Sequence, residues 1–361
     1  MTRSSTTGPS GRATEVLARL LGGGSGTVFA LIVVIFAFVF VMNPSFAQPR
    51  TMVAFFLLPA AGVVVLAIGQ YFVIVSGELD LSVGSLVGAQ VVIAARLLEG
   101  DDSRTFGVLA LMVGFGALVG LVNGLVVTLL RVPSIITTLG MMLILFGAIR
   151  LWTGGAPTGE LSTRFRILGR DGISDVPVIG QLPWAVLVLV VVGALAVWVM
   201  RTPYGRTLMA VGDNDVTVRF SGARVWQIRT AAFVACSLLT TLAAILIGGR
   251  SGLTAQVGQG LEFTAITAVV LGGIVLGGGR GTVVGAIGGA LALQALFVLF
   301  NQFGMPSTLN PAVQGLIIIA AVAYAARPRT GSSFRLLRRG RDDQRDTQPA
   351  PPTGGAPTRR D

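Results

Sequence analysis

The chain has 361 residues, of which 53% are hydrophobic and only 12% are charged, and its mean hydropathy is +0.79. A soluble domain is not this apolar or this poor in charge. The apolar residues also come in runs near the roughly 20 that are needed to cross a bilayer. The composition therefore excludes a soluble domain and predicts an all-α, polytopic transmembrane bundle that lies among membrane lipids.

The charged and sulfur-containing residues exclude several kinds of site. The formal net charge is +11, but much of it lies in the two ends of the chain, so it does not indicate a nucleic-acid partner. With no His and one cysteine, Cys236, the usual zinc and iron–sulfur ligand sets cannot be assembled. The chain also has no Lys, which a P-loop needs for its phosphates. If ATP drives this protein, another subunit binds the ATP.

Apolar runs separated by polar turns predict about ten transmembrane helices within a membrane domain at 27–326. The expected helices are 27–42, 52–75, 85–98, 106–130, 134–151, 182–200, 230–249, 264–276, 282–300 and 312–326. The first run is read as a retained helix, because no clear cleavage site follows it. Residues 1–26 and 327–361 are rich in Arg, Gly, Pro and Ser and are expected to be disordered tails. Ten crossings place both tails on one side, and the Arg-rich flanks mark that side as cytoplasmic.

A polar stretch at 76–85 interrupts two apolar runs with two carboxylates, serines and glycines. Charges at membrane depth are costly and usually face a cavity or a partner, and broken backbone is tolerated there only inside protein or beside water. One interpretation is a helix break in a transport pathway. The other is a surface loop in which Asp80 or Ser82 caps the next helix, and the two interpretations are compatible.

Small residues and a proline predict local features of two helices. Gly116, Gly120 and Gly124 recur every four residues and predict close packing along one helix face. Asn123 lies beside this face, where an interhelical hydrogen bond is favoured over a substrate contact. Pro59 predicts a kink in the helix at 52–75.

A weak internal repeat relates the break at 76–85 to a second Gly-rich stretch at 277–281. Residues 76–81 followed by 86–89 resemble residues 271–276 followed by 283–286. Paired interruptions of this kind point to a transport pathway at the interface between two repeats.

Several motifs in order resemble the permease subunits of bacterial ATP-binding-cassette importers for monosaccharides, the ribose/xylose/galactoside type. The segment at 77–85 resembles that family's G-x-[IF]-D-L-S-V-G-S. Further resemblances lie at 123–124, 132–140, 201–206, 210–214, 221–222, 269–273 and 278–282. The resemblance covers about 27–326 and implies a multi-pass protein of the bacterial cytoplasmic membrane.

The resemblance also implies a set of partners: a second permease chain, a cytoplasmic P-loop ATPase that carries ATP and Mg, and an extracytoplasmic sugar-binding protein. The permease itself would bind no cofactor or metal and would not be an enzyme. The polar loop at 201–229 would then be the coupling segment, a short surface helix seated on the ATPase; otherwise it is a solvated basic loop. The candidate coupling residues are Tyr204, Gly205, Arg206, Asp213, Asn214 and Arg219.

A pathway for a pentose or hexose needs hydroxyl, amide and carboxylate partners. The candidates on the membrane segments are Glu78, Asp80, Ser82, Asn123 and Gln294. The alternative function is an ion-coupled secondary carrier for a small polar solute, for which Glu78 and Asp80 are the acidic residues near membrane depth. A membrane enzyme is disfavoured, because no nucleophile–base pair or metal set is available.

Overall fold

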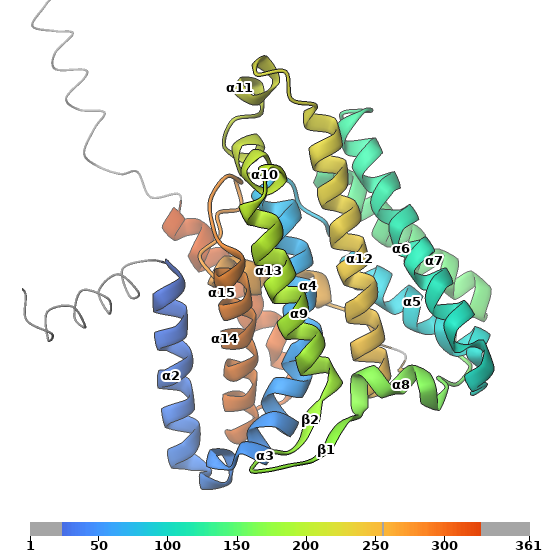
Figure 1. Ribbon diagram of the computed structural model, residues 1–361, viewed down its shortest axis with the longest axis vertical. Helices are drawn as coiled ribbons and strands as arrows, with labels where there is room; N and C mark the ends of the chain where they lie inside the picture. The colour runs from blue at the N-terminus through green and yellow to red at the C-terminus, as the bar shows by residue number, and fades with distance from the viewer. Residues whose placement is uncertain (1–23, 255, 326–361) are drawn as a thin grey trace, which may run out of the picture. The chain divides into compact units, whose positions relative to one another are not determined.

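The computed structural model describes residues 24–254 and 256–325, and the chain in these ranges is mainly helical (Figure 1). The apolar helices are α2 (Gly24–Met42), α4 (Leu58–Val75), α5 (Val83–Leu98), α6 (Thr105–Thr128), α7 (Ser134–Thr153), α9 (Trp184–Arg201), α12 (Val225–Ser251), α13 (Leu261–Leu271), α14 (Val283–Gln302) and α15 (Asn310–Ala325). The predicted all-α, polytopic class is confirmed. The predicted tails lie almost entirely outside the described residues, and the packing described below lies within residues 24–321.

Within the described ranges, six helices are long and apolar enough to cross a membrane. They are Pro49–Val75, Asp102–Thr128, Ser134–Thr153, Trp184–Arg201, Val225–Ser251 and Val283–Gln302. Four further apolar stretches fall short of this length: Gly26–Met42, Val83–Leu98, Leu261–Leu271 and Ser307–Ala320. The number of ten crossings therefore stays a prediction.

The chain forms several short, irregular helical turns just before α4. The chain forms η1 (Pro44–Ala47), α3 (Pro49–Met52) and a π-helical turn η2 (Val53–Leu57), and α4 follows. Pro59 lacks the N–H that would bond back to the preceding turn, and a π-helical turn is a common local accommodation. The kink predicted near Pro59 stays a prediction.

Helix α4 lies in the centre of the core. It is buried along nearly its whole length and packs against α9, α12, α13 and α14. A helix that is apolar on all sides has to be enclosed in this way or face lipid. Helix α7, by contrast, keeps large apolar side chains such as Leu143 and Ile144 exposed.

Helices α6 and α12 approach closely through the predicted glycine face. A Cβ on Gly120 would lie 2.8 Å from the Phe233 carbonyl oxygen, and one on Gly124 would lie 2.8 Å from the Thr230 Cα. A Cβ on Gly116 would overlap the Thr241 hydroxyl. The close packing predicted from the four-residue spacing is confirmed.

The polar segments lie at opposite ends of the helical bundle (Figure 1). At one end lie α10 (Pro203–Asp213) and α11 (Asp215–Phe220), so that two short helices stand where one was predicted. At the other end lie α8 (Thr163–Arg170) and an antiparallel hairpin of β1 (Gly172–Val176) and β2 (Gly180–Pro183). This hairpin was not predicted from the sequence.

Candidate translocation and coupling site

The first helix break occupies residues 76–82, between α4 and α5, and side chains of α7 hold its backbone. The Leu79 N–H donates to the Ser134 hydroxyl (3.2 Å), and the Leu81 N–H donates to the Thr138 hydroxyl (3.0 Å). Ser134 and Thr138 lie one turn apart, on the same face of α7. Backbone donors at membrane depth need such partners, so α7 stabilises the extended conformation of the break.

Three of the predicted pathway residues come together where α5 begins. Asp80 is fully buried, and its Oδ1 accepts from the backbone N–H (2.8 Å) and the hydroxyl (2.6 Å) of Ser82. The Ser82 hydroxyl in turn accepts from the Asn123 side-chain amide of α6 (3.0 Å). The interhelical hydrogen bond predicted for Asn123 is therefore present. Asp80 bonds Ser82, the residue just before α5, but neither side chain accepts from an N–H of the first turn of α5, so the expected helix cap is not formed.

Several buried side-chain atoms on the apolar helices have no hydrogen-bond partner among the described residues. Asp80 Oδ2 and Asn123 Oδ1 are buried without a partner among the described residues. The same is true of side-chain atoms on α4, α5, α12 and α13: Gln70 Nε2, Gln90 Oε1, Ser237 Oγ, Thr240 Oγ1, Glu262 Oε2 and Thr267 Oγ1. Unpaired polar atoms in an apolar interior are costly, and these atoms are of the types that bind a hydroxylated solute.

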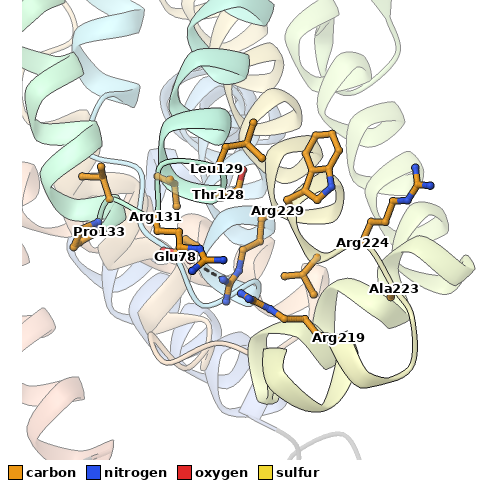
Figure 2. Close-up of a pocket in the computed structure, with 13 residues that line it drawn as sticks. Glu78, Thr128, Leu129, Arg131, Pro133, Arg219, Ala223, Arg224 and Arg229 are labelled. Carbon is orange, nitrogen blue, oxygen red and sulfur yellow. Dashed lines mark ion pairs between the residues drawn. The ribbon is translucent and has the colours of Figure 1, made fainter.

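Glu78 and Gln294 lie apart from this group. Glu78 Oε1 forms an ion pair with Arg229 of α12 (3.3 Å), the dashed contact in Figure 2. Gln294 lies half-buried on α14, and no hydrogen bond among the described residues joins it to Asp80. The pathway roles of these two residues stay predictions.

Arg229 links the first break to α11. Its Nη1 lies 3.3 Å from Glu78 and 3.7 Å from Asp215 of α11, and its Nε donates to the Ser76 carbonyl oxygen (3.3 Å). The sequence analysis did not select Arg229 or Asp215, because a loop with many charges does not show which of them pair.

The six candidate coupling residues divide into inward-facing and exposed groups. The Tyr204 hydroxyl donates to the Ile228 carbonyl oxygen (3.3 Å), and burial raises the pKa of this phenol above its usual range. Gly205 is buried against Met200. The Asn214 side chain caps α11 by accepting from the Thr217 N–H (3.0 Å). The exposed group is Arg206, Asp213, Asn214 and Arg219.

The end of α10 lies directly against both helix breaks. The second break, residues 272–282, separates α13 from α14, and its Gly279 N–H donates to the Val75 carbonyl oxygen at the end of α4 (2.9 Å). A Cβ on Gly212 would overlap that oxygen and would lie 2.5 Å from the Gly279 nitrogen. A Cβ on Gly278 would lie 2.7 Å from the Gly77 Cα. The paired interruptions predicted from the weak repeat are both present, and they touch.

Two interrupted membrane helices, buried polar groups and a helix pair seated on both interruptions define a membrane transport protein of the permease class. The family model for the permease component of branched-chain amino acid transport systems matches residues 52–322, and the chain belongs to this family. No solved structure matches the chain.

Relatives with an assigned function are similar over most of their length. The "Autoinducer 2 import system permease protein LsrC" of Enterobacter sp. (strain 638) is 34% identical over 305 residues, which cover 84% of this chain and 87% of the relative. The protein of the same name from Yersinia enterocolitica is 33% identical over 329 residues, covering 91% and 89%. The one from Escherichia coli O157:H7 is 33% identical over 277 residues, covering 76% and 79%. The predicted resemblance to permeases of ATP-binding-cassette importers is confirmed at the level of the family.

Proposed function

We propose that this chain forms the membrane pathway for a small, uncharged, hydroxylated solute of the monosaccharide class, and that a separate ATPase drives it by alternating access. The buried hydroxyl, amide and carboxylate atoms without a partner, Asp80 Oδ2 and Asn123 Oδ1 among them, support this solute class, because they offer hydrogen bonds. The relatives are named for autoinducer 2 import, so autoinducer 2 belongs beside pentoses and hexoses among the solutes to test.

The contact of α10 with both breaks is the observation that carries the proposal. Gly212 leaves no space between α10, the Val75 carbonyl and Gly279. A partner that displaces α10 therefore displaces the ends of α4 and of the second break at the same time. Alternating access requires the two repeats to move around one pathway, and this contact provides a direct mechanical connection to both.

The outer surface of α11 supports ATPase docking. Phe220 is 88% exposed and Val216 is 56% exposed, and they lie one turn apart beside the exposed Arg219. An exposed aromatic side chain next to Arg is typical of the residues that dominate the binding energy of protein interfaces. We infer that this face of α11 inserts into a groove of the ATPase, which holds the ATP and Mg.

The proposed orientation follows from the same contact. The end with α10 and α11 would face the cytoplasm of a bacterial cell, together with both ends of the chain. The opposite end, with α8 and the hairpin, would receive solute from an extracytoplasmic binding protein. A second permease chain, identical or related, would complete the pathway.

Affinity purification of this chain from its native membrane in mild detergent, followed by mass spectrometry, tests the proposal. We expect a P-loop ATPase to co-purify, and we expect uptake into proteoliposomes to require ATP. Recovery of the chain alone, with uptake that survives ATP depletion but stops with an uncoupler, would instead show an ion-coupled carrier. If an extracytoplasmic binding protein co-purifies with the chain, titrating it with ribose, xylose, galactose and autoinducer 2 identifies the solute.

A further inference from the structure

A positively charged pocket lies beside the Arg229 ion pair, and one of its lining residues, Arg219, also borders the face of α11 that is proposed to dock the ATPase. Its volume is about 590 Å³, and it lies between the α6–α7 connection and the start of α12 (Figure 2). Its charged lining residues are Glu78, Arg131, Arg219, Arg224 and Arg229. A pocket with four arginines and one carboxylate favours an anionic ligand.

The carboxylates nearby do not neutralise the guanidinium groups. Arg229 pairs with Glu78 and Asp215, and Arg219 pairs with the same Asp215 (2.9 Å). Arg131 has no carboxylate partner among the described residues. In Figure 2 the side chains of Arg131, Arg219 and Arg229 extend toward the same side of the pocket, next to Glu78, whereas that of Arg224 extends away. Like charges gathered in this way are stabilised when an anion lies between them.

The backbone of Arg131 has a conformation that is unfavourable for arginine. Arg131 has φ of 57°, in the left-handed region where glycine is the favoured residue. A residue other than Gly, Asn or Asp in this conformation costs about 1 kcal/mol or more. Glycine would remove that cost, so the position keeps an arginine despite its backbone.

The surroundings of the pocket are those of a membrane–water boundary. Leu129 and Leu130, next to Arg131 in the chain, are exposed, and Trp226 on the other wall is half-exposed. Tryptophan is enriched where lipid headgroups meet the apolar core. A ligand with a phosphate and adjacent acyl chains therefore matches the pocket better than a free phosphate does.

We propose that this pocket binds the phosphate group of an anionic phospholipid from the leaflet at this end of the bundle. Arg131 and Arg219 contact the phosphate, and the acyl chains lie against Leu129 and Trp226. Because Arg219 belongs to α11 and Arg131 lies between α6 and α7, the bound headgroup braces α11 against the membrane helices. This site depends only on the chain being embedded in a membrane, not on the solute or on the ATPase.

Thermal unfolding of the purified full chain in detergent tests the site. The probes are phosphatidylglycerol, phosphatidylcholine, inorganic phosphate and glucose 6-phosphate, each titrated separately. We expect phosphatidylglycerol alone to raise the unfolding temperature, and native mass spectrometry to detect a retained lipid of that class. Equal stabilisation by glucose 6-phosphate or inorganic phosphate would overturn the lipid assignment in favour of a soluble phosphate ligand. The absence of any shift would overturn the site.

Variants of Arg131 separate binding from folding. Arg131→Gly should leave the stability of the lipid-free chain unchanged or raise it, and should weaken phosphatidylglycerol binding by about tenfold, the value of one charge-assisted hydrogen bond. Arg131→Gln serves as a second variant with a side chain of similar length. Arg224→Gln removes the same charge from a side chain that extends away, and should bind like the wild type. Equal losses in Arg131→Gln and Arg224→Gln would show diffuse surface charge rather than a built pocket, and would overturn the proposal.

Discussion

Replacing Gly212 by alanine tests the contact on which the proposed coupling rests. The added Cβ would lie 2.5 Å from the Gly279 nitrogen and would overlap the Val75 carbonyl oxygen. Because ordinary carbon contacts begin near about 3.5 Å, the end of α10 must move by about 1 Å. Both neighbours are backbone atoms joined by a 2.9 Å hydrogen bond, so neither can rotate away. Overpacking of this kind costs about 1–3 kcal/mol.

The expected result is loss of coupling with the complex intact. The exposed face of α11 is unchanged in Gly212→Ala, so the ATPase should still co-purify. ATP-dependent uptake in proteoliposomes should fall by about tenfold or more, since each 1.4 kcal/mol corresponds to a factor of ten. Hydrolysis should lose its stimulation by solute and binding protein.

A matched glycine variant provides the control. Gly114 lies on α6, and a Cβ there would meet nothing within 4 Å. Gly114→Ala should therefore transport like the wild type. Equal uptake by Gly212→Ala and Gly114→Ala, at equal expression and with equally monodisperse protein, would refute the mechanical role of α10.

Four further single variants and one double variant test other residues of the site and of α11. Glu78→Gln should lower thermal stability less than Arg229→Gln does, because Arg229 keeps Asp215 as a partner in the first variant. The variant with both changes should show a coupling energy of about 1–3 kcal/mol between the two residues. Strictly additive effects of the two changes would contradict the ion pair. Phe220→Ser should leave the isolated chain stable but weaken ATPase co-purification by about tenfold, from the loss of about 1.5–3 kcal/mol of apolar burial; an unchanged complex would remove Phe220 from the interface. Asp80→Asn should impair uptake more than membrane insertion, and normal uptake would remove Asp80 from the site.

Much of the fold was predictable because helix period, run length and glycine spacing are local properties of the sequence. The break at 76–85 and the close approach at Gly120 follow from the residue types within a few turns. The hairpin of β1 and β2 was not predictable, because its nine residues carry no clear alternation between apolar and polar positions. Its strands pair with each other beneath α9, a tertiary arrangement that local patterns do not specify.

The residue types of the site could be predicted from the sequence, but the residues with which each one forms hydrogen bonds or ion pairs could not. Asp80, Ser82 and Asn123 were selected from composition, and the structure joins them. Glu78 was selected on the same ground, as a carboxylate at membrane depth, but the structure pairs it with Arg229 instead. Thr138 bonds back to its own helix and also accepts from the Leu81 N–H of the break, a contact that was not predicted. The Thr138 hydroxyl lies one helical turn from that of Ser134, and this spacing was the sequence signal that both could bond one neighbouring segment.

Under the proposed function, the first break has two ends with different properties. Its start touches α10 at the Val75 carbonyl and is bonded to Arg229, which also pairs with Asp215 of α11, so both coupling helices reach it. Its end is held by Ser82 and Asn123 to α6, which is locked to α12 through glycine contacts. A displacement of α10 would therefore change the angle of the break rather than carry it as a rigid unit. Asp80 lies at the end that stays fixed, so its neighbours would move past it while its bond to Ser82 persists.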